Sequence, residues 1–325
     1  MKAEILAMLR EKKGYVSGQE MSERLGVSRT AVWKVIHQLN REGYEIKAVQ
    51  NRGYRLTEAP DVMSESELQS LRKTKWVGER ICYFDEIDST NSRASQLAEE
   101  GALHGTLVVA DHQNSGRGRR GRSWSSPSQT GIFMTLLLRP DIEPANASML
   151  TLLAALAVAR GIEKNTGLTV QIKWPNDIVI NGKKVCGILT EMNAQMDYVN
   201  HIIIGIGINV HNTEFPDEIV QTATSIYLES GRHVQRAELI EAIWEEFEAC
   251  YEGFLETQDL SSVLKEYDQY LVNRGKRVCV LDPKGTFEGV AEGITERGEL
   301  LVETAEGQRK VASGEVSVRG VYGYV

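Results

Sequence analysis

The sequence has only four cysteines in 325 residues, and none of them lies in a C-x-x-C pair. Zinc sites and disulfide frameworks need closely spaced or paired cysteines, so this composition disfavours both and favours reduced thiols in the core. The N-terminus also lacks an uninterrupted apolar segment, because Met1–Leu6 alternates charged and apolar residues. We therefore expect a cytoplasmic protein without a secretory signal.

Long hydrophobic runs and several nucleotide and hydrolase motifs are missing too. The longest apolar run, residues 149–159, is shorter than the roughly 20 residues that a membrane helix needs, so we expect a buried helix and no membrane association. The sequence has no G-x-S-x-G elbow, no G-x-x-x-x-G-K-[ST] loop and no G-x-G-x-x-G between a strand and a helix. These absences argue against a serine hydrolase, a P-loop enzyme and a dinucleotide-binding fold.

Charge is distributed unevenly along the chain. The first 60 residues carry eleven Lys and Arg against seven Asp and Glu, a net charge of +4, which leaves −12 for the remainder of a chain whose total is −8. A basic segment of this size on an acidic protein is typical of a nucleic-acid-binding module. With 42% apolar residues, a chain of this length is expected to form two or three domains.

The first 60 residues have the pattern of a winged helix-turn-helix. Apolar residues at helical spacing predict three helices, the second closed by Gly26 and the third capped by Ser28. The turn signature Gln50–Gly53 lies between two strand-like segments and predicts a β-hairpin wing. A three-helix interaction domain with a charged surface would have a similar pattern. If the module binds DNA, the contacting residues are expected to be Ser28, Arg29, Thr30, Trp33, Lys34, His37 and, in the wing, Arg52.

Beyond a linker at residues 57–61 the pattern changes to mixed strands and helices. Asn181-Gly182 separates two strand-like runs and is a strong type I′ hairpin signal, which predicts antiparallel neighbours. Antiparallel strands among helices favour an α+β sheet over a doubly wound fold. From about Asn273, short strands and frequent turns, such as the turn at 283–285 and a last strand from 315, predict a small SH3-like β-barrel. The expected domains are residues 1–60, 65–271 and 272–325.

The stretch Gly116–Trp124 places four arginines among glycines directly after a predicted strand. Glycine lets backbone N–H groups approach a ligand, guanidinium groups match carboxylate and phosphate geometry, and the indole of Trp124 could cover a base. A solvated basic loop or an arginine-glycine element for RNA binding has the same composition. A second unusual segment, Lys173–Asp177, precedes the hairpin lysines Lys183 and Lys184. Together the two segments favour phosphoryl or nucleotidyl transfer, in which charge on phosphate oxygens must be neutralised.

Taken together and in this order, these segments resemble the biotin protein ligases. The N-terminal helix-turn-helix and the C-terminal barrel resemble the bifunctional bacterial subclass, whose members also repress biotin operons. The resemblance covers essentially the whole chain and rests on Asp88–Asn91, Gln113 with Gly116–Trp124, Lys173–Asp177, Lys184–Leu189 and Gly205–Asn209.

The resemblance implies a two-step reaction. The carboxylate of biotin would attack the α-phosphate of Mg·ATP, and the resulting biotinyl-5′-adenylate would acylate a lysine of a biotin carboxyl carrier protein. Implied partners are the acceptor domain of acetyl-CoA or pyruvate carboxylase and operator DNA, bound by a ligand-promoted homodimer. Biotin and ATP are the implied substrates, Mg²⁺ is the implied metal ion, and no tightly bound prosthetic group is expected.

The resemblance also implies roles for individual residues. Lys184 and Arg119 would be catalytic, and Asp177 is a candidate magnesium ligand. Ser89 or Thr90 could instead be only the N-cap of a helix. The implied biotin-binding residues are Ser89, Thr90, Asn91, Gln113, Arg117, Gly118, Arg119 and Lys184. The implied ATP or adenylate residues are Arg120, Arg122, Trp124, Lys173, Asn176 and Asn209.

Two other functions are compatible with the sequence. One is a repressor that senses a small acid without catalysis. The presence of Lys184 and Arg117–Arg119 argues against this function. The other is a ligase for lipoate or a similar acyl acid. The uncharged polar set at Ser89–Asn91 and Gln113 resembles a pocket for a ureido ring more than one for an apolar dithiolane.

Overall fold

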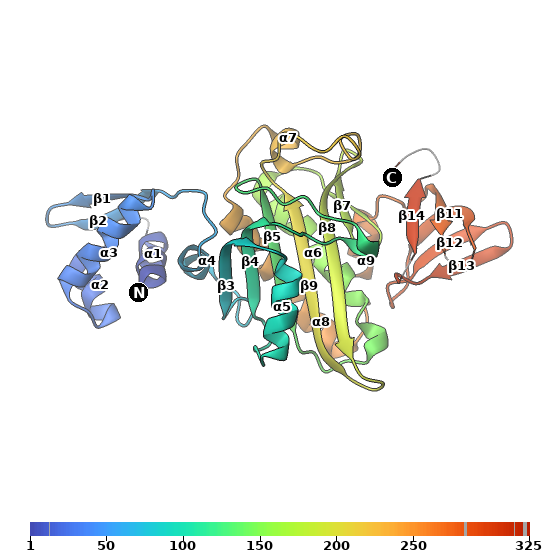
Figure 1. Ribbon diagram of the computed structural model, residues 1–325, viewed down its shortest axis with the longest axis horizontal. Coiled ribbons are helices and arrows are strands. Elements are labelled where there is room, and N and C mark those ends of the chain that lie inside the picture. Colours follow the sequence, from blue (N-terminus) through green and yellow to red (C-terminus); the bar gives the residue numbers. More distant parts are fainter. Residues whose placement is uncertain (13, 283–284, 315, 321–323) are drawn as a thin grey trace.

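The computed structural model describes residues 1–12, 14–282, 285–314, 316–320 and 324–325. Three bodies lie in a row along the longest axis, as Figure 1 shows. They are an N-terminal group of helices with a two-stranded sheet, a central seven-stranded sheet with helices, and a C-terminal five-stranded sheet. The multidomain α+β class predicted from the sequence is confirmed.

The N-terminal body is the predicted winged helix-turn-helix. The hydroxyl of Ser28 accepts a hydrogen bond from the backbone N–H of Ala31 at 3.2 Å, and Gly26 ends the second helix in the left-handed conformation. Gly53 is required at the wing, because a Cβ there would lie 2.1 Å from the carbonyl oxygen of Val16. The elements are α1 (Lys2–Glu11), α2 (Gly18–Leu25), α3 (Arg29–Arg41), β1 (Glu45–Val49) and β2 (Gly53–Glu58).

The central sheet is mixed, with the order β3-β4-β5-β9-β8-β7-β6. Its first two strands are parallel and all the other neighbours are antiparallel. Asn181 and Gly182 have φ values of 50° and 76°, as a type I′ turn requires, and join β7 to β8 as predicted. The strands are β3 (Ile81–Ile87), β4 (Leu107–Gln113), β5 (Gly131–Leu138), β6 (Gln171–Lys173), β7 (Asp177–Ile180), β8 (Lys183–Ala194) and β9 (Val199–Asn209).

Helices cover both faces of this sheet. Successive side chains of a strand point to opposite sides, and on β9 apolar side chains of both sides pack against helices. On β9, Ile204 and Ile206 belong to the main core with α6 (Met149–Thr166) and α8 (Arg236–Thr257), whereas Ile203 packs with α5 (Thr90–Glu99). Figure 1 shows α5 in front of the sheet and α8 behind it. The start of α5 lines a pocket on this face, which is described below.

Helix α6 corrects one argument from the sequence. The apolar run there is short, but the helix extends to 18 residues and, with the preceding turn, residues 144–166 are long and apolar enough to cross a membrane. The length argument was therefore wrong. The conclusion that this is a buried helix is confirmed, since 72% of its most apolar window lies inside the protein and the helix packs against α8 in the core.

The C-terminal body is an antiparallel sheet of order β13-β12-β11-β10-β14, which confirms the predicted small all-β domain. The turn expected at 283–285 and the strand expected from 315 fall partly outside the described residues. Its strands are β10 (Arg277–Leu281), β11 (Phe287–Ile294), β12 (Leu300–Thr304), β13 (Gly307–Val311) and β14 (Ser317–Gly320). The remaining elements, which the sequence pattern missed, are α4 (Glu65–Leu71), α7 (Ile226–Ser230), α9 (Leu264–Tyr270) and the 3₁₀ turns Arg119–Gly121 and Pro144–Asn146.

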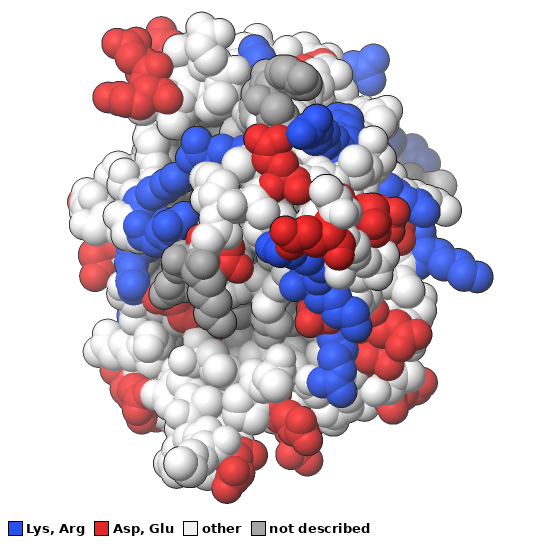
Figure 2. All heavy atoms as spheres, turned by 90° about the vertical axis from the view of Figure 1, so that its right-hand side faces the viewer, with Lys and Arg blue, Asp and Glu red and all other residues white. Residues whose placement is uncertain are grey.

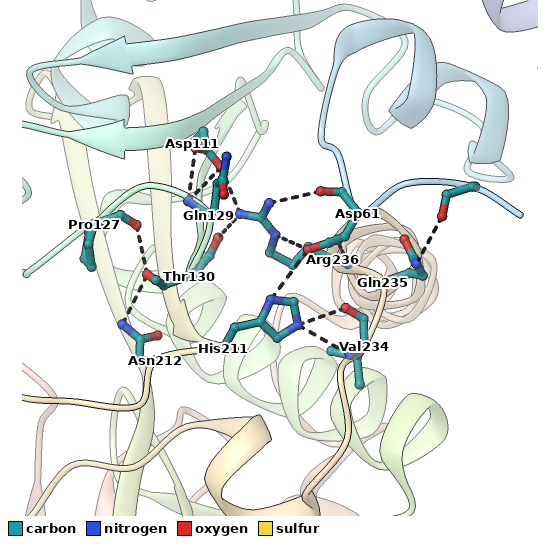
Figure 3. A network of polar contacts seen from close by, with 12 residues as sticks. Asp61, Asp111, Pro127, Gln129, Thr130, His211, Asn212, Val234, Gln235 and Arg236 are labelled. Atoms are coloured by element: carbon teal, nitrogen blue, oxygen red, sulfur yellow. Dashed lines mark hydrogen bonds and ion pairs between the residues drawn. The ribbon is translucent and has the colours of Figure 1, made fainter. Parts of the chain in front are cut away.

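A buried arginine joins the linker to the central sheet (Figure 3). Arg236, at the start of α8, is only 2% exposed, and its Nε lies 2.8 Å from Oδ2 of Asp61 in the linker. Its Nη1 lies 2.9 Å from Oδ1 of Asp111 on β4 and also donates to the carbonyl of Gly131. His211 faces the same carboxylate of Asp61 at 3.5 Å. The position of the linker is thus tied to the strand that leads into the arginine-glycine loop.

Candidate active site

The site lies along one row of residues that crosses four strands of the central sheet. Lys173 on β6 pairs with Asp177 on β7, Asp177 pairs with Gly187 on β8, and Gly187 pairs with Gly207 on β9. Residues paired in adjacent strands share a face of the sheet. The row therefore runs from a charged end to two glycines, on the face that carries α5.

The two glycines make a floor for Trp124. A Cβ on Gly207 would lie 2.6 Å from the indole of Trp124, and one on Gly187 would lie 2.9 Å from it. Only glycine therefore permits the indole to lie this close to the sheet. The indole Nε1 is buried and has no hydrogen-bond partner among the described residues. An unpaired buried donor at the edge of a cleft is suited to a ligand that supplies an acceptor.

A second row, two residues further along the strands, carries a network of uncharged polar side chains, which we call the polar row. Leu189, Gly205 and Thr135 pair across β8, β9 and β5. The hydroxyl of Thr135 donates to the Oδ1 of Asn91 at 2.8 Å, and a Cβ on Gly205 would lie 1.9 Å from that oxygen. This network holds Asn91 against the sheet at the start of α5.

The polar row continues into the end of β4. Both the backbone N–H and the hydroxyl of Thr90 donate to the Oε1 of Gln113, and the Nε2 of Gln113 donates to Ser126. Ser89 is the N-cap of α5, so the structural role considered for it is confirmed, and it lines the pocket as well. The side chains are fixed by one another and offer both donors and acceptors, which suits a neutral ring with N–H and C=O groups.

The arginine-glycine loop closes on itself over these rows. Gly118 N–H donates to the carbonyl of Arg122 at 2.7 Å, and Trp124 N–H donates to that of Gly116 at 2.8 Å. A Cβ on Gly116 would lie 2.4 Å from the carbonyl oxygen of Trp124, so glycine is needed there. The loop forms a small hairpin that carries Arg117 and Arg119 into the pocket wall.

Arg119 connects the loop to two other parts of the chain. Its Nη1 donates to Oδ1 of Asn176 at 2.6 Å, and its Nη2 donates to the carbonyl oxygens of Ser313 and Gly314 in the C-terminal domain. Burial lowers the pKa of Arg119 from its usual value, and Asp177 opposes that effect. Because these acceptors are neutral, the guanidinium charge remains available to an anion in the pocket.

A β-bulge aims Lys184 at the site. Lys184 pairs with Val179 and Cys186 with Ile178, so Val185 is an extra residue, and both Val185 and Cys186 point into the core. This shift turns Lys184 to the ligand face, where its Nζ lies 2.6 Å from Oδ1 of Asp177. Lys184 lines the pocket, whereas Asp177 lies behind it.

Charge at the outer end of the row is tuned by burial. Burial lowers the pKa of Lys173 to about 8, opposed by Asp177 and reinforced by Lys184. Burial alone would raise the pKa of Asp177, but Lys184 and a hydrogen bond from Tyr324 bring it below its usual value. Three cationic side chains, Lys173, Lys184 and Arg119, thus meet one carboxylate, which leaves a net positive site suited to phosphate.

Most of the residues predicted for the site converge on one pocket. Its open space is about 450 Å³, including the part that opens to solvent. Five predicted residues do not line it: Lys173 and Asp177 lie behind it, Arg120 and Arg122 are exposed on the loop, and Asn209 donates to the carbonyl of Thr224. The pocket is lined by Ser89, Thr90, Asn91, Gln113, Arg117, Gly118, Arg119, Trp124, Asn176, Lys184, residues 187–189 of β8 and residues 205–207 of β9.

Asp177 does not have the surroundings of a metal site held by protein ligands alone. Its Oδ1 contacts Lys184 and also accepts from Asn176 at 3.1 Å, and its Oδ2 accepts from Tyr324 at 2.6 Å. Within the described part of the chain, no group of three or more His, Cys, Asp or Glu could hold a metal ion. All four cysteines lie in that part and are free thiols, as predicted. A metal ion is therefore expected here only as part of a nucleotide substrate.

The residues predicted to contact DNA are all exposed. Val32, Ile36 and Leu39 bury the inner stripe of α3, while Trp33 is 50% exposed and its ring lies 4.1 Å from that of His37. Arg52 is exposed on the wing, with its guanidinium 5.1 Å above the ring of Tyr15. The other exposed residues of this set are Ser28, Arg29, Thr30 and Lys34.

Comparisons with known proteins agree with this geometry. Residues 83–209 match the Biotin/lipoate A/B protein ligase family, residues 2–55 match an HTH domain and residues 275–319 match the biotin protein ligase C terminal domain. The bifunctional ligase/repressor BirA of Bacillus spizizenii is 46% identical over 94% of each chain, and that of Escherichia coli is 30% identical over 93% of this chain and 92% of its own. The chain belongs to the bifunctional ligase/repressor family. The solved biotin protein ligase from Aquifex aeolicus in complex with biotin and ATP gives a TM-score of 0.67 at 32% identity, covering 74% of this chain and 99% of that one.

Several residues of this ligase site were not predicted from the sequence. Glu191 on β8 lies 3.0 Å from the Nη2 of Arg117 and also accepts from Asn91 at 2.7 Å, so it ties the loop to the polar row. Thr135 and the carbonyl acceptors of the C-terminal domain were missed as well. The alternation of glycine with isoleucine in Gly205–Asn209 could have revealed the floor, but the partners of Arg117 and Arg119 depend on contacts far apart in the chain.

Proposed function

We propose that this chain activates biotin with ATP and transfers it to a lysine of a biotin carrier domain, and that the same chain represses transcription at an operator. The observation that carries the proposal is the joining, in one pocket, of an uncharged polar row to a cationic row covered by Trp124. The polar row would hold the ureido ring, and the cationic row would hold the nucleotide. The family membership of the chain supports the same assignment.

In the first step, a carboxylate oxygen of biotin attacks the α-phosphorus of Mg·ATP, and the bond to the β,γ-pyrophosphate breaks. Two anionic groups must approach each other, so the main barrier is electrostatic. Lys184 and Arg119 would lower it by neutralising charge between the two rows. Mg²⁺ enters as part of the nucleotide.

In the second step, the neutral ε-amine of an acceptor lysine attacks the carbonyl of the mixed anhydride. An amide forms, AMP leaves and the amine loses a proton. No side chain of the ligase is acylated. The loop Gly116–Trp124 lies over both rows and would exclude water from the anhydride until the acceptor arrives.

The remaining assignments follow from the same proposal. The domains are residues 1–60 for operator binding, 65–271 for ligation and 272–325 as the barrel that contacts Arg119. The partners are the carrier domain of acetyl-CoA or pyruvate carboxylase and operator DNA. The adenylate-loaded form would pair as a homodimer to read two half-sites in the cytoplasm.

Pyrophosphate release by the purified chain tests the ligase assignment. With Mg·ATP we expect release that requires biotin, is far weaker with lipoate and is absent without an acid. Lys184→Ala should reduce the biotin-dependent rate at least about 100-fold, as loss of a charge-stabilising group commonly does, whereas Lys183→Ala, the exposed neighbour, should leave it unchanged. Preference for lipoate would indicate the other ligase class, and the absence of release with any acid would indicate a repressor that only senses its ligand.

A further inference from the structure

The last residues of the chain return to the central sheet and reach the charged end of the site. The hydroxyl of Tyr324 donates to Oδ2 of Asp177 at 2.6 Å. The ring of Tyr324 lies under the ammonium group of Lys173, whose Nζ is 3.2 Å from the ring centroid. Val325 packs on the β7–β8 turn, 3.3 Å from where a Cβ of Gly182 would lie. Three separate contacts therefore hold the C-terminus at this place.

These contacts form a relay from the C-terminus to the pocket. Tyr324 engages one oxygen of Asp177, and Lys184 engages the other at 2.6 Å. Neither Tyr324 nor Asp177 lines the pocket, whereas Lys184 does. The hydroxyl of Tyr324 can therefore influence the reacting groups only indirectly, through Asp177 and Lys184, whereas its ring contacts Lys173, and neither part blocks a ligand.

The hydroxyl of Tyr324 matters because a carboxylate has two oxygens to satisfy. A buried carboxylate oxygen that loses its hydrogen-bond donor is left unsatisfied, which costs free energy unless another donor or cation takes that place. Without the hydroxyl, the carboxylate of Asp177 would rotate toward the neighbouring cations and shift the ammonium of Lys184, which its Oδ1 already contacts. The Tyr324 hydroxyl on the far oxygen fixes the rotation of the Asp177 carboxylate, and thereby the position of the Lys184 ammonium, which contacts the other oxygen and lines the pocket.

We propose that Tyr324 is a positioning residue for the adenylation step, which orients Asp177 and through it Lys184. This inference rests on the proposed ligase function. It gives the end of the chain a role in chemistry that is separate from the contacts of Arg119 with the C-terminal domain.

The test is single-turnover adenylation by the full-length chain, with biotin and Mg·ATP varied in turn. Tyr324→Phe keeps the ring on Lys173 and removes only the hydroxyl. We expect it to lower the rate constant at saturating substrates about three- to tenfold, with less than about twofold change in either apparent affinity, because one charge-assisted hydrogen bond is lost behind the site. Tyr15→Phe, which removes a hydroxyl in the DNA-binding domain, is the matched control and should leave the rate unchanged.

A double-mutant cycle with Asp177→Asn separates positioning from a general structural effect. If Tyr324 acts through Asp177, Tyr324→Phe should cause no further loss in the Asp177→Asn background. An unchanged rate in Tyr324→Phe, a faster rate, or an equal loss in both backgrounds would each overturn the proposal. Absence of biotin-dependent adenylation in the wild-type chain would instead overturn the proposed function.

Discussion

At the scale of single residues, burial decides which charges the site can use. Lys173 is 6% exposed and faces both Asp177 and the ring of Tyr324. Removal from water disfavours the ammonium form, and the carboxylate only partly compensates. The pKa of about 8 places the charge change of Lys173 within the range in which the enzyme can be assayed.

Lys173 therefore predicts a pH dependence of nucleotide binding. Lys173 lies behind the pocket, and its charge acts on bound phosphates through space, so the KM for ATP should be constant below about pH 8 and should rise as the pH increases through that value. Lys173→Arg should remove this rise, because a guanidinium stays charged throughout. The measurement is biotin-dependent pyrophosphate release between about pH 7 and about pH 9.5. A KM in the wild type that is flat across this range would contradict the assignment.

Gly207 predicts a defect confined to the nucleotide side. In Gly207→Ala the new Cβ would meet the indole of Trp124 at 2.6 Å, so the ring must leave its floor. We expect the KM for ATP to rise about tenfold, because one contact between the base and an aromatic ring is lost. The KM for biotin should change little. Gly14→Ala adds a methyl group where nothing lies within 4 Å and serves as the control. Equal loss of affinity for both substrates would mean that the floor serves the whole pocket.

At the scale of elements, the register between strands brings the site residues together. The sequence predicted only part of this register. Asn181-Gly182 fixed the β7–β8 hairpin in advance, because its backbone angles suit few other residues. The extra residue Val185 could not be foreseen, since a bulge is set by pairing with the neighbouring strand. The row from Lys173 to Gly207 depends on three registers between four strands, and no local pattern specifies the pairing of β8 with β9.

The start of α8 predicts a large effect on stability. Arg236 bridges Asp61 and Asp111 while almost fully buried, so Arg236→Met would leave both carboxylates without their partner. We expect a loss of about 3–5 kcal/mol in the free energy of unfolding, measured by urea denaturation. Arg232→Met, an exposed arginine before the same helix, should change it by less than about 0.5 kcal/mol. An equally small effect for Arg236 would show that the bridge contributes little.

At the scale of the whole molecule, the three domains lie in a row and the site touches two of them. The DNA-binding domain meets α4 through Glu67, which accepts a hydrogen bond from Tyr44 and pairs with Arg10. At the other end, the view onto the C-terminal side in Figure 2 shows Lys and Arg interspersed with Asp and Glu. The exposed residues Arg29, Lys34 and Arg52 make the N-terminal domain the expected DNA-binding surface.

The separation of the domains predicts that the two activities can be separated by mutation. Lys34→Ala should weaken operator binding about tenfold and reduce its salt dependence, while pyrophosphate release remains unchanged, because Lys34 lies on the exposed face of α3. Lys265→Ala removes an exposed lysine from α9 and is the control for charge alone. If Lys34→Ala lost both operator binding and pyrophosphate release, the assignment of these two activities to separate domains would be contradicted.

Domain order, the winged helix and the central motifs could be predicted because each depends on local sequence. The contacts that join the domains could not. Asp61, Arg236 and Tyr324 are distant in the chain, and nothing near them in sequence indicates their partners. These long-range pairs connect the linker to the β4 strand and the C-terminus to Lys184.

The central claim is that one adenylate-loaded protein serves both ligation and repression. The most direct test is a gel shift of operator DNA with the full-length chain, with and without biotin, Mg·ATP and an acceptor domain. The account predicts a tight complex only when biotin and Mg·ATP are both present, and its loss when an acceptor with an intact target lysine is added, but not when that lysine is replaced by arginine. Full operator binding without biotin or ATP would contradict it.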